Sequence, residues 1–270
     1  MKSLIKTAVF TNDTINVVKN VYITPGLRFD DINTSGSFLS PGLGVTYKPA
    51  DNTTLRFIST RGFNVPGLAE TYGHGIHYLP NMGLKVEKVW SYQTGIETTA
   101  LKYIWLKLSL FRHDVDDAIA RVQLDTTHYT YENTAKQRRQ GLEVEMETVP
   151  LYNVSINGGY SFIDTRDLIN QTRPIDTPRH TTDIGLLYRK SGLMALLQGH
   201  YIIWDNTIQG YPANDKAFVF NLNVTKRLYQ NKNINAEVLL TAHNIFNGSQ
   251  NDSGYENPRR WFEGGVRFNF

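Results

Sequence analysis

The sequence predicts an all-β protein: a single antiparallel, up-and-down sheet of the transmembrane β-barrel type. Apolar and polar residues alternate along many segments, short and long connections alternate between those segments, and aromatic residues make up 12% of the 270 residues. Alternation with a period of two places one set of side chains on each face of a strand. Aromatic residues are also enriched in strands. Together these observations favour strands with one apolar face and one polar face.

Alternation is clearest where leucines interleave with polar residues: Leu106 and Leu108 share one face, and Lys107 and Ser109 share the other. Comparable patterns predict strands in five segments: Tyr103–His113, Leu142–Met146, Tyr152–Phe162, Phe218–Val224 and Ile234–Leu240. The glutamates that alternate with Leu142, Val144 and Met146 are interpreted as a solvated row of charge on the polar face. About twelve strands are expected, with a possible thirteenth in Ser3–Phe10.

The connections sort by length. Tight turns are expected near Lys48–Asn52, Ala100–Lys102, Val149–Leu151, Lys190–Gly192 and Gln230–Lys232. Longer polar connections are expected at Asp31–Ser37, Asn64–Val86, Val115–Lys136, Asp164–Arg179, Asp205–Lys216 and Asn244–Arg259. A meander with this alternation has all its long loops at one end, as outer-membrane barrels do. A soluble β-sandwich would also alternate, but its loops would not sort in this way.

Composition excludes several classes. The absence of cysteine removes disulfides, thiolate metal sites and cysteine nucleophiles. A net charge of +3 indicates no nucleic-acid partner. No apolar run approaches the ~18 residues of a spanning helix. The apolar part of the N-terminus turns polar at Thr11, so no signal peptide is expected in this chain.

Several segments then resemble TonB-dependent outer-membrane receptors, in the order and spacing of that family. They are Ile23–Asp30 (ITPGLRFD), Leu39–Tyr47 (LSPGLGVTY), Arg61–Leu68 (RGFNVPGL), Leu79–Glu97, Tyr131–Asn133 with Gln140–Glu145, Ala242–Asn247 (AHNIFN) and Arg260–Phe270. The resemblance implies a barrel of about 22 strands with a plugged lumen. The signal peptide, TonB box and plug of the family are not found in this sequence. The chain therefore looks like the C-terminal half of a receptor barrel, with an N-terminal remnant strand and turn in 1–20 and the barrel portion in 21–270.

The same resemblance implies function and partners. It implies an outer-membrane receptor fragment for TonB-energised uptake of a ferric siderophore, haem or cobalamin. The partners would be the lipid bilayer of the outer membrane, the TonB complex through a plug, and the barrel-assembly machinery. A passive channel made by a small self-closing barrel is the alternative. No GxSxG, HExxH or phosphate-binding glycine loop is present, so we expect no enzyme, catalytic residue, bound metal or cofactor.

Two sets of residues are candidates for function. Tyr72, His74, His77 and Tyr78 lie in the longest expected loop, where imidazole and tyrosinate could ligate haem iron; an ordinary solvated loop is the competing interpretation. In the last strand, Phe262, Val266, Phe268 and Phe270 share an apolar face, which the resemblance identifies as the strand that closes the barrel.

Overall fold

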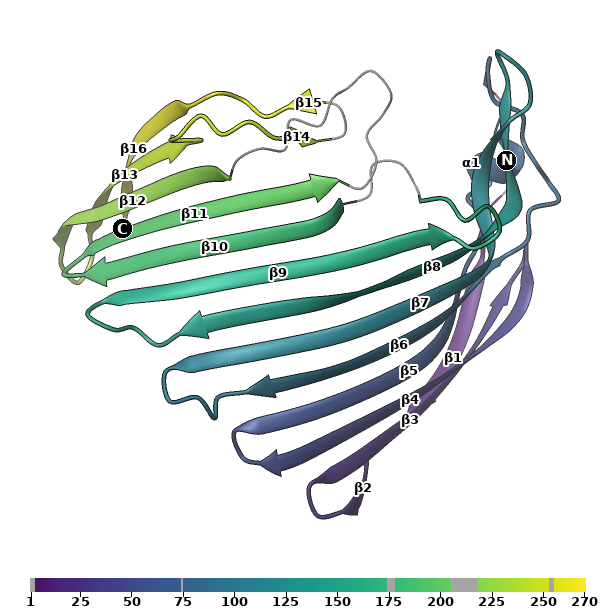
Figure 1. Ribbon diagram of the computed structural model, residues 1–270, viewed down its shortest axis with the longest axis horizontal. Coiled ribbons are helices and arrows are strands. Elements are labelled where there is room, and N and C mark those ends of the chain that lie inside the picture. Colours follow the sequence, from purple (N-terminus) through teal and green to yellow (C-terminus); the bar gives the residue numbers. More distant parts are fainter. Residues whose placement is uncertain (1–2, 74, 174–177, 205–217, 253–254) are drawn as a thin grey trace. The chain divides into compact units, whose positions relative to one another are not determined.

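The computed structural model describes residues 3–73, 75–173, 178–204, 218–252 and 255–270, and it confirms the predicted all-β, up-and-down antiparallel fold (Figure 1). The first elements are β1 (Lys6–Asn12), β2 (Ile15–Val18), β3 (Val21–Ile32), β4 (Gly36–Ala50), β5 (Thr53–Asn64), α1 (Leu68–Tyr72), β6 (Glu87–Thr98), β7 (Ile104–Gln123) and β8 (Tyr129–Thr148). They are followed by β9 (Val154–Asp167), β10 (Pro178–Lys190), β11 (Leu193–Trp204), β12 (Val219–Gln230), β13 (Asn235–His243), β14 (Asn251–Asp252), β15 (Tyr255–Glu256) and β16 (Trp261–Asn269).

Within the described residues, fourteen strands form one sheet in the order β1-β3-β4-β5-β6-β7-β8-β9-β10-β11-β12-β13-β16, and β2 also pairs with β3. β1 and β2 pair with successive parts of β3, on the side that β4 does not occupy. They act as one interrupted strand, so the sheet has the expected twelve strand positions and the thirteenth at its start. The remnant predicted in Ser3–Phe10 corresponds to β1 and begins three residues later.

Two expected connections are wrong. Asp31–Ser37 was predicted as a longer connection, but β3 and β4 leave only residues 33–35 between them. Val115–Lys136 was predicted as a long loop, but β7 and β8 continue through most of it and leave only residues 124–128 between them. Polar side chains on both faces hid this extension from a pattern based on apolar alternation. Lys136 pairs with Asp116 and Arg138 with Asp114 across the two strands, at 2.8 and 2.7 Å.

By its contacts the chain divides into two units. The first comprises Met1–Ile96, Ser109–Gly141 and Asp164–Arg173, and the second comprises Glu97–Leu108, Leu142–Ile163 and Pro174–Phe270. In the first unit, Asp30 is fully buried, accepts hydrogen bonds of 2.9 Å from Nε and Nη2 of Arg28, and pairs with Lys6 at 3.3 Å. This charged group ties the edge strand β1 to β3.

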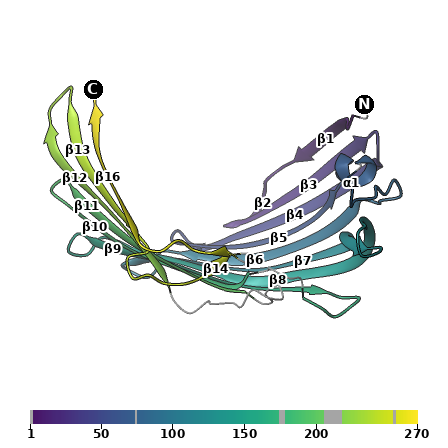
Figure 2. The same ribbon diagram turned by 90° about the horizontal axis from the view of Figure 1, so that it is seen from above.

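In the second unit, β9 to β13 and β16 lie side by side in the order of their pairing (Figures 1 and 2). Directly paired residues share a face of the sheet. One such row crosses six strands and is apolar throughout: Ile156, Leu186, Leu197, Leu222, Ala242 and Phe262. The adjacent row of the opposite face carries Asn157, Gln198 and Asn221. The alternation in the sequence is thus converted into two chemically distinct faces.

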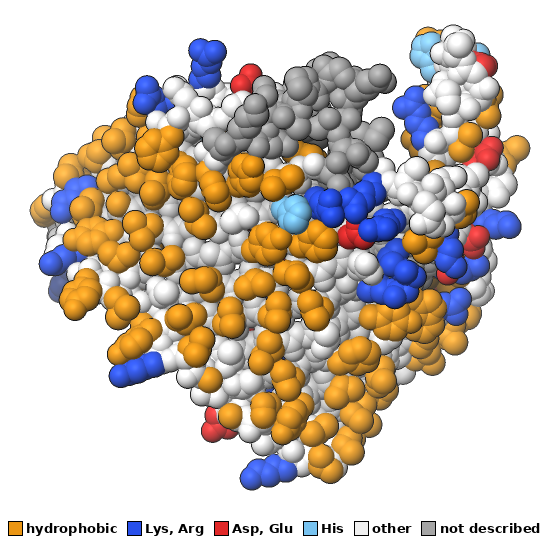
Figure 3. Space-filling view, viewed as in Figure 1, with side chains coloured by type: hydrophobic (Ala, Val, Ile, Leu, Met, Phe, Trp, Pro, Cys, Tyr) orange, Lys and Arg blue, Asp and Glu red, His pale blue; other side chains and the backbone are white. Residues whose placement is uncertain are grey.

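Apolar side chains lie mainly on the surface, and the buried set is small and largely polar. Among the described residues, Asp30, Ser109, Thr130, Asp164, Asn244 and Gln250 are buried, whereas the buried apolar residues are Ile32, Val86 and three alanines. Large exposed apolar side chains occupy alternate positions of the strands, as in Leu27, Phe29, Leu39 and Leu43. Figure 3 shows such side chains spread over the strands of one face. A soluble protein would expose few apolar surfaces of this extent.

Among the described residues, no helix has the length and apolar character needed to cross a membrane.

Candidate ligand-binding site

The loop that follows β5 begins with the short helix α1. The amide of Gly67 donates to Oε2 of Glu70 at 2.8 Å, which satisfies one exposed donor at the helix start. The helix ends at Gly73, whose amide donates to the carbonyl oxygen of Ala69 at 2.8 Å. A Cβ atom at Gly73 would lie 2.4 Å from that oxygen, so only glycine allows this close approach.

The next part of the loop is fastened along the start of β8 by backbone and side-chain hydrogen bonds. Leu79 N donates to Tyr129 O, and Tyr129 N donates to His77 O, both at 2.9 Å. Thr130 Oγ1 donates to Leu79 O at 2.8 Å, and Asn81 Nδ2 donates to Tyr131 O at 2.9 Å. Segments about fifty residues apart in the sequence therefore form one structure.

This fastening brings three tyrosines together. The rings of Tyr78 and Tyr129 have centroids 5.5 Å apart, Tyr78 and Tyr131 are 5.6 Å apart, and Tyr129 and Tyr131 are 6.1 Å apart. The guanidinium of Arg121, from β7, lies 3.7 Å from the centroid of the Tyr129 ring. We call Tyr78, Arg121, Tyr129 and Tyr131 the tyrosine cluster.

Tyr129 and Tyr131 are two residues apart on β8, so they share a face. By the same alternation this is the face of Glu143 and Glu145, and Glu145 pairs with Lys107 at 2.7 Å. The tyrosine cluster therefore continues the polar face of the sheet into the loops. In transmembrane β-barrels the polar face of the strands is the one turned toward the lumen.

Of the four residues predicted for ligand binding, Tyr78 lies in the tyrosine cluster and His77 lies beside it. Nδ1 of His77 bonds to the carbonyl oxygen of Thr127 at 3.0 Å, at the tip of the β7–β8 hairpin. Tyr72 is the last residue of α1. His74 lies outside the described residues. No group of three potential metal ligands of the His, Cys, Asp or Glu type occurs in the described part of the chain.

The side chain of Tyr78 is held as a neutral phenol by its hydrogen bond and by its raised pKa. Its hydroxyl donates to the carbonyl oxygen of Ala69 at 2.8 Å. Burial is the main cause that raises its pKa above the ordinary value, and the nearby carboxylate of Glu70 raises it further. A phenol held in this way is suited to hydrogen bonding and ring contacts rather than to binding iron as a phenolate.

The hairpin tip beside His77 is held by one carboxylate. Asp125 accepts hydrogen bonds from Thr127 N, Thr127 Oγ1 and His128 N at 2.7 to 2.8 Å, and its second oxygen is 2.9 Å from His128 Nδ1. The backbone bond from Thr127 is the largest cause that lowers the pKa of Asp125 far below its ordinary value. The tip is therefore fixed by an ionised side chain in solvent.

Sequence reasoning missed Arg121, Tyr129 and Tyr131. The aromatic spacing Tyr129-x-Tyr131 was a usable signal, because it places two rings on one strand face. Their proximity to Tyr78 carried no signal in the sequence, since it depends on how the long loop folds back.

Comparison with known proteins decides the family. Residues 4–247 match the family model described as "TonB dependent receptor-like, beta-barrel". The chain belongs to this family. The match runs from just before β1 to the turn after β13, so nearly every strand described above is part of a receptor barrel.

Two relatives and one solved structure show which receptors the chain is similar to. The chain is 20% identical to a probable TonB-dependent siderophore receptor, PiuA, of Acinetobacter baumannii over 88% of its length and 36% of the relative's. It is 26% identical to the ferrienterobactin receptor of Escherichia coli over 50% of its length and 21% of the relative's. The siderophore receptor PirA of Pseudomonas aeruginosa shares the fold, with a TM-score of 0.77, 17% identity, and coverage of 99% of this chain and 47% of PirA. The chain therefore spans less than half of the receptors it matches.

The family segment AHNIFN folds into a turn that is held by its asparagines. Asn244 and Asn247 both have positive φ, 46° and 53°, a conformation that asparagine tolerates. The buried Asn244 donates from Nδ2 to the carbonyl oxygens of Gly248 and Pro258, both at 2.9 Å. Asn247 Oδ1 accepts from the amide of Arg260 at 2.9 Å. We call Asn244 and Asn247, with the groups that their side chains bond in Gly248, Pro258 and Arg260, the asparagine turn.

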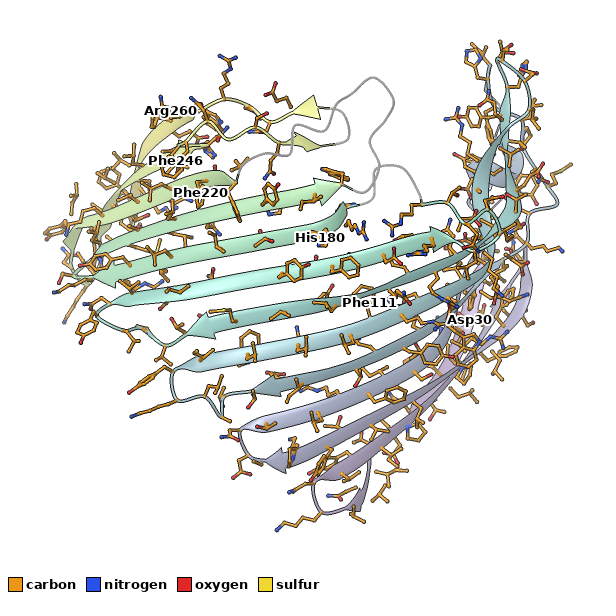
Figure 4. The ribbon with its side chains drawn as sticks, viewed as in Figure 1. Asp30, Phe111, His180, Phe220, Phe246 and Arg260 are labelled. Carbon is orange, nitrogen blue, oxygen red and sulfur yellow. The ribbon has the colours of Figure 1, made fainter. Side chains whose placement is uncertain are left out.

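On the apolar face the asparagine turn is anchored by Phe246, whose ring meets that of Phe220 edge-on at 5.4 Å (Figure 4). Phe220 in turn lies over Gly199 of the neighbouring strand, where a Cβ atom would approach it to 2.5 Å. The AHNIFN segment thus uses Asn244 and Asn247 to hold the backbone of the turn and Phe246 to pack on the apolar face of the sheet.

The predicted closing strand corresponds to β16. It pairs with β13 from Asn235↔Asn269 to His243↔Trp261. Phe262, Val266, Phe268 and Phe270 are all exposed, and the rings of Phe268 and Phe270 stack at 6.5 Å. The structure confirms neither their role in closing a barrel nor the ligand role of the loop residues, and both stay predictions.

Proposed function

We propose that this chain supplies wall strands and external loops of an outer-membrane, TonB-dependent receptor for a ferric siderophore. The tyrosine cluster is the observation that carries the proposal. It offers aromatic faces, phenol hydroxyls and a guanidinium at the loop end of the polar face, where a large ligand arrives first. Aromatic and arginine side chains are the residue types that dominate binding energies.

A siderophore fits this chemistry better than haem or cobalamin. A ferric chelate brings its own iron ligands, so the protein needs to recognise only the chelate's surface and charge. Arg121 provides the charge for an anionic chelate, and the rings provide contact area. The hydrogen bond from the Tyr78 hydroxyl to Ala69 holds the Tyr78 ring in place for such contacts. The names of two relatives, a siderophore receptor and a ferrienterobactin receptor, support the same class of ligand.

The remaining roles follow from the family. The exposed apolar rows would face the lipid bilayer of the outer membrane, and the barrel-assembly machinery would insert the strands, with β16 as the closing strand. A plug domain would connect the receptor to TonB. We propose no catalytic role and no bound cofactor.

The test measures binding of ferric enterobactin and of haem, separately, to purified protein that contains this chain in detergent. The matched pair of variants is Tyr131→Ala, in the tyrosine cluster, and Tyr152→Ala, a tyrosine 95% exposed in the tight turn between β8 and β9. We expect Tyr131→Ala to weaken ferric enterobactin binding at least about tenfold, the size typical of an aromatic hot spot. Tyr152→Ala should leave binding unchanged.

Equal losses in both variants would overturn the assignment of the site. Haem binding that is tighter than ferric enterobactin binding would replace the siderophore by haem. Steady single-channel conductance of the protein, unaffected by either ligand, would favour the passive channel instead.

A further inference from the structure

A group of charged residues interrupts the apolar face of the sheet on β7, β8 and β9. On β7 the alternate positions run through Leu110, which is 46% exposed, and then become charged at Arg112 and Asp114. Lysine and arginine side chains gather over the ends of these strands in Figure 3. We call Arg112, Asp114, Arg138, Asp164, Arg166 and Arg173 the ionic belt.

Two carboxylates organise the ionic belt from within. Asp114 accepts hydrogen bonds from Nε of Arg112 and Nε of Arg138, both at 2.7 Å. Asp164 accepts from Nε of Arg166 at 2.9 Å, and Nη2 of Arg173 is 3.1 Å away. The carboxylates are the covered members, with side chains 19% and 9% exposed, whereas those of Arg112 and Arg166 are 45% and 48% exposed.

The hydrogen-bonding atoms show which donors remain. Arg112, Arg138 and Arg166 each donate to a carboxylate through Nε, which leaves Nη donors at the end of each guanidinium for a further acceptor. A planar guanidinium presents five donors, and the two Nη groups match a phosphate oxygen pair. Four guanidinium groups against two carboxylates also leave the belt with a positive charge.

The place of the belt along the strand is equally informative. β7 and β8 are 20 residues long, about twice the ~9–11 residues that cross a bilayer. The change from Leu110 to Arg112 on the lipid-side positions therefore marks the depth at which the bilayer's apolar core ends. Cationic side chains at that depth meet lipid headgroups.

We propose that the ionic belt binds the phosphate groups of a phosphorylated glycolipid in the leaflet on the loop side of the membrane. One arginine would neutralise each aspartate, so the need to balance a covered carboxylate does not account for four arginines held by two aspartates. The aspartates fix the guanidinium planes, and the net positive charge draws the phosphate. The inference rests on the membrane placement given under the proposed function, but not on the identity of the transported ligand.

The experiment measures which lipid stays bound to the purified protein in detergent, by native mass spectrometry, when equal amounts of diphosphoryl lipid A and its dephosphorylated form are offered. We expect the wild type to retain the diphosphoryl form about tenfold over the other, a preference that weakens at high salt. The triple variant Arg112→Gln, Arg138→Gln, Arg166→Gln should lose this preference. Replacing the same three arginines by lysine should restore only part of it, because lysine keeps the charge without the paired donors.

The matched control is Lys107→Gln, which removes an exposed cation from an ion pair with Glu145 on the opposite face. It should keep the full preference for the diphosphoryl form.

Inorganic phosphate at millimolar concentration should not displace the lipid. Displacement would reduce the belt to a site for free phosphate and overturn the lipid proposal. Equal retention of both lipids by the wild type, or equal losses in Lys107→Gln and the triple variant, would also overturn it. Because both lipids compete on the same folded molecules, a poorly folding variant lowers both signals without mimicking a lost preference, and ferric enterobactin binding serves as a separate readout of the transport site.

Discussion

The tyrosine cluster and the asparagine turn are both built around loops, but they are held together in different ways. The asparagine turn is the more local of the two: the side chains of Asn244 and Asn247 bond to groups at most 14 residues away, and the backbone amide of the buried Asn244 donates to Asn221 Oδ1, 23 residues away. The tyrosine cluster joins residues 78, 121, 129 and 131 through ring contacts and backbone bonds across about 50 residues. A local, buried, hydrogen-bonded turn serves folding, whereas a long-range cluster of partly exposed rings is suited to contact a ligand.

The largest effect is expected from Asn244→Ala. Alanine removes the shorter of the two side-chain hydrogen bonds to each of the carbonyl oxygens of Gly248 and Pro258, which leaves only those from Asn257 Nδ2 at 3.0 and 3.2 Å. Alanine is also strained at the positive φ of this position. We expect the free energy of unfolding to fall by about 2–4 kcal/mol, measured by urea denaturation in lipid vesicles. Asn244→Gly keeps the backbone conformation, so it should cost about 1 kcal/mol less. Equal costs would show that the backbone conformation is not part of the asparagine's role.

The second largest effect is expected when the contact between Phe220 and Phe246, which anchors the same turn, is disturbed. Gly199→Ala places a Cβ atom 2.5 Å from the Phe220 ring and forces it away from Phe246. We expect a loss of about 1–3 kcal/mol by the same measurement, the usual cost of overpacking. Gly265→Ala on β16 is the matched control, since a Cβ atom there meets no other atom within 4 Å. A comparable loss at Gly265 would mean that glycine in the strands, rather than the Phe220 contact, sets the stability.

The local stability of the β7–β8 hairpin tip, beside the tyrosine cluster, should depend on pH. Because the pKa of Asp125 is lowered in the folded state, its stabilising effect is complete above the ordinary value of 3.8 and is lost as the pH falls below it. Hydrogen exchange of the Thr127 and His128 amides, corrected for the intrinsic rate, should therefore accelerate in acid. The amides of Asn233 and Ile234, which bond to the amide side chain of Asn231, provide a turn without a titrating acceptor. Parallel acceleration in both turns would assign the effect to general acid unfolding.

The smallest effect is expected from Tyr78→Phe. It removes the hydrogen bond to Ala69 but keeps the ring against Tyr129 and Tyr131. A local loss of about 0.5–1.5 kcal/mol should appear as faster hydrogen exchange in residues 68–81, with global unfolding unchanged. A drop in global stability as large as that of Asn244→Ala would remove the contrast between the two regions.

The sequence alone determined the strands and their faces. Alternation with a period of two is a local property, and a membrane sheet needs it in every strand, so Tyr152–Phe162 and Ile234–Leu240 located β9 and β13. The ends of the strands were less exact, because Tyr152 belongs to the turn before β9. The AHNIFN segment could be identified from the sequence because it resembles a family pattern, whereas the hydrogen bonds that hold it reach up to 23 residues away. Where the alternation became polar on both faces, as in Val115–Lys136, the pattern failed, since cross-strand ion pairs such as Arg138 with Asp114 leave no apolar period to detect.

Only the tertiary structure decided which residues meet. Tyr78 reaches Tyr129 and Tyr131 because Leu79 and Asn81 bond to the backbone of β8, and no local pattern encodes that docking. The same holds in part for the ionic belt: Arg112 with Asp114 and Arg166 with Asp164 lie two residues apart on one strand, but Arg138 and Arg173 reach these aspartates only through the tertiary structure. Local periodicity fixes which way a side chain points, but contact between distant segments is selected by the free energy of the whole fold.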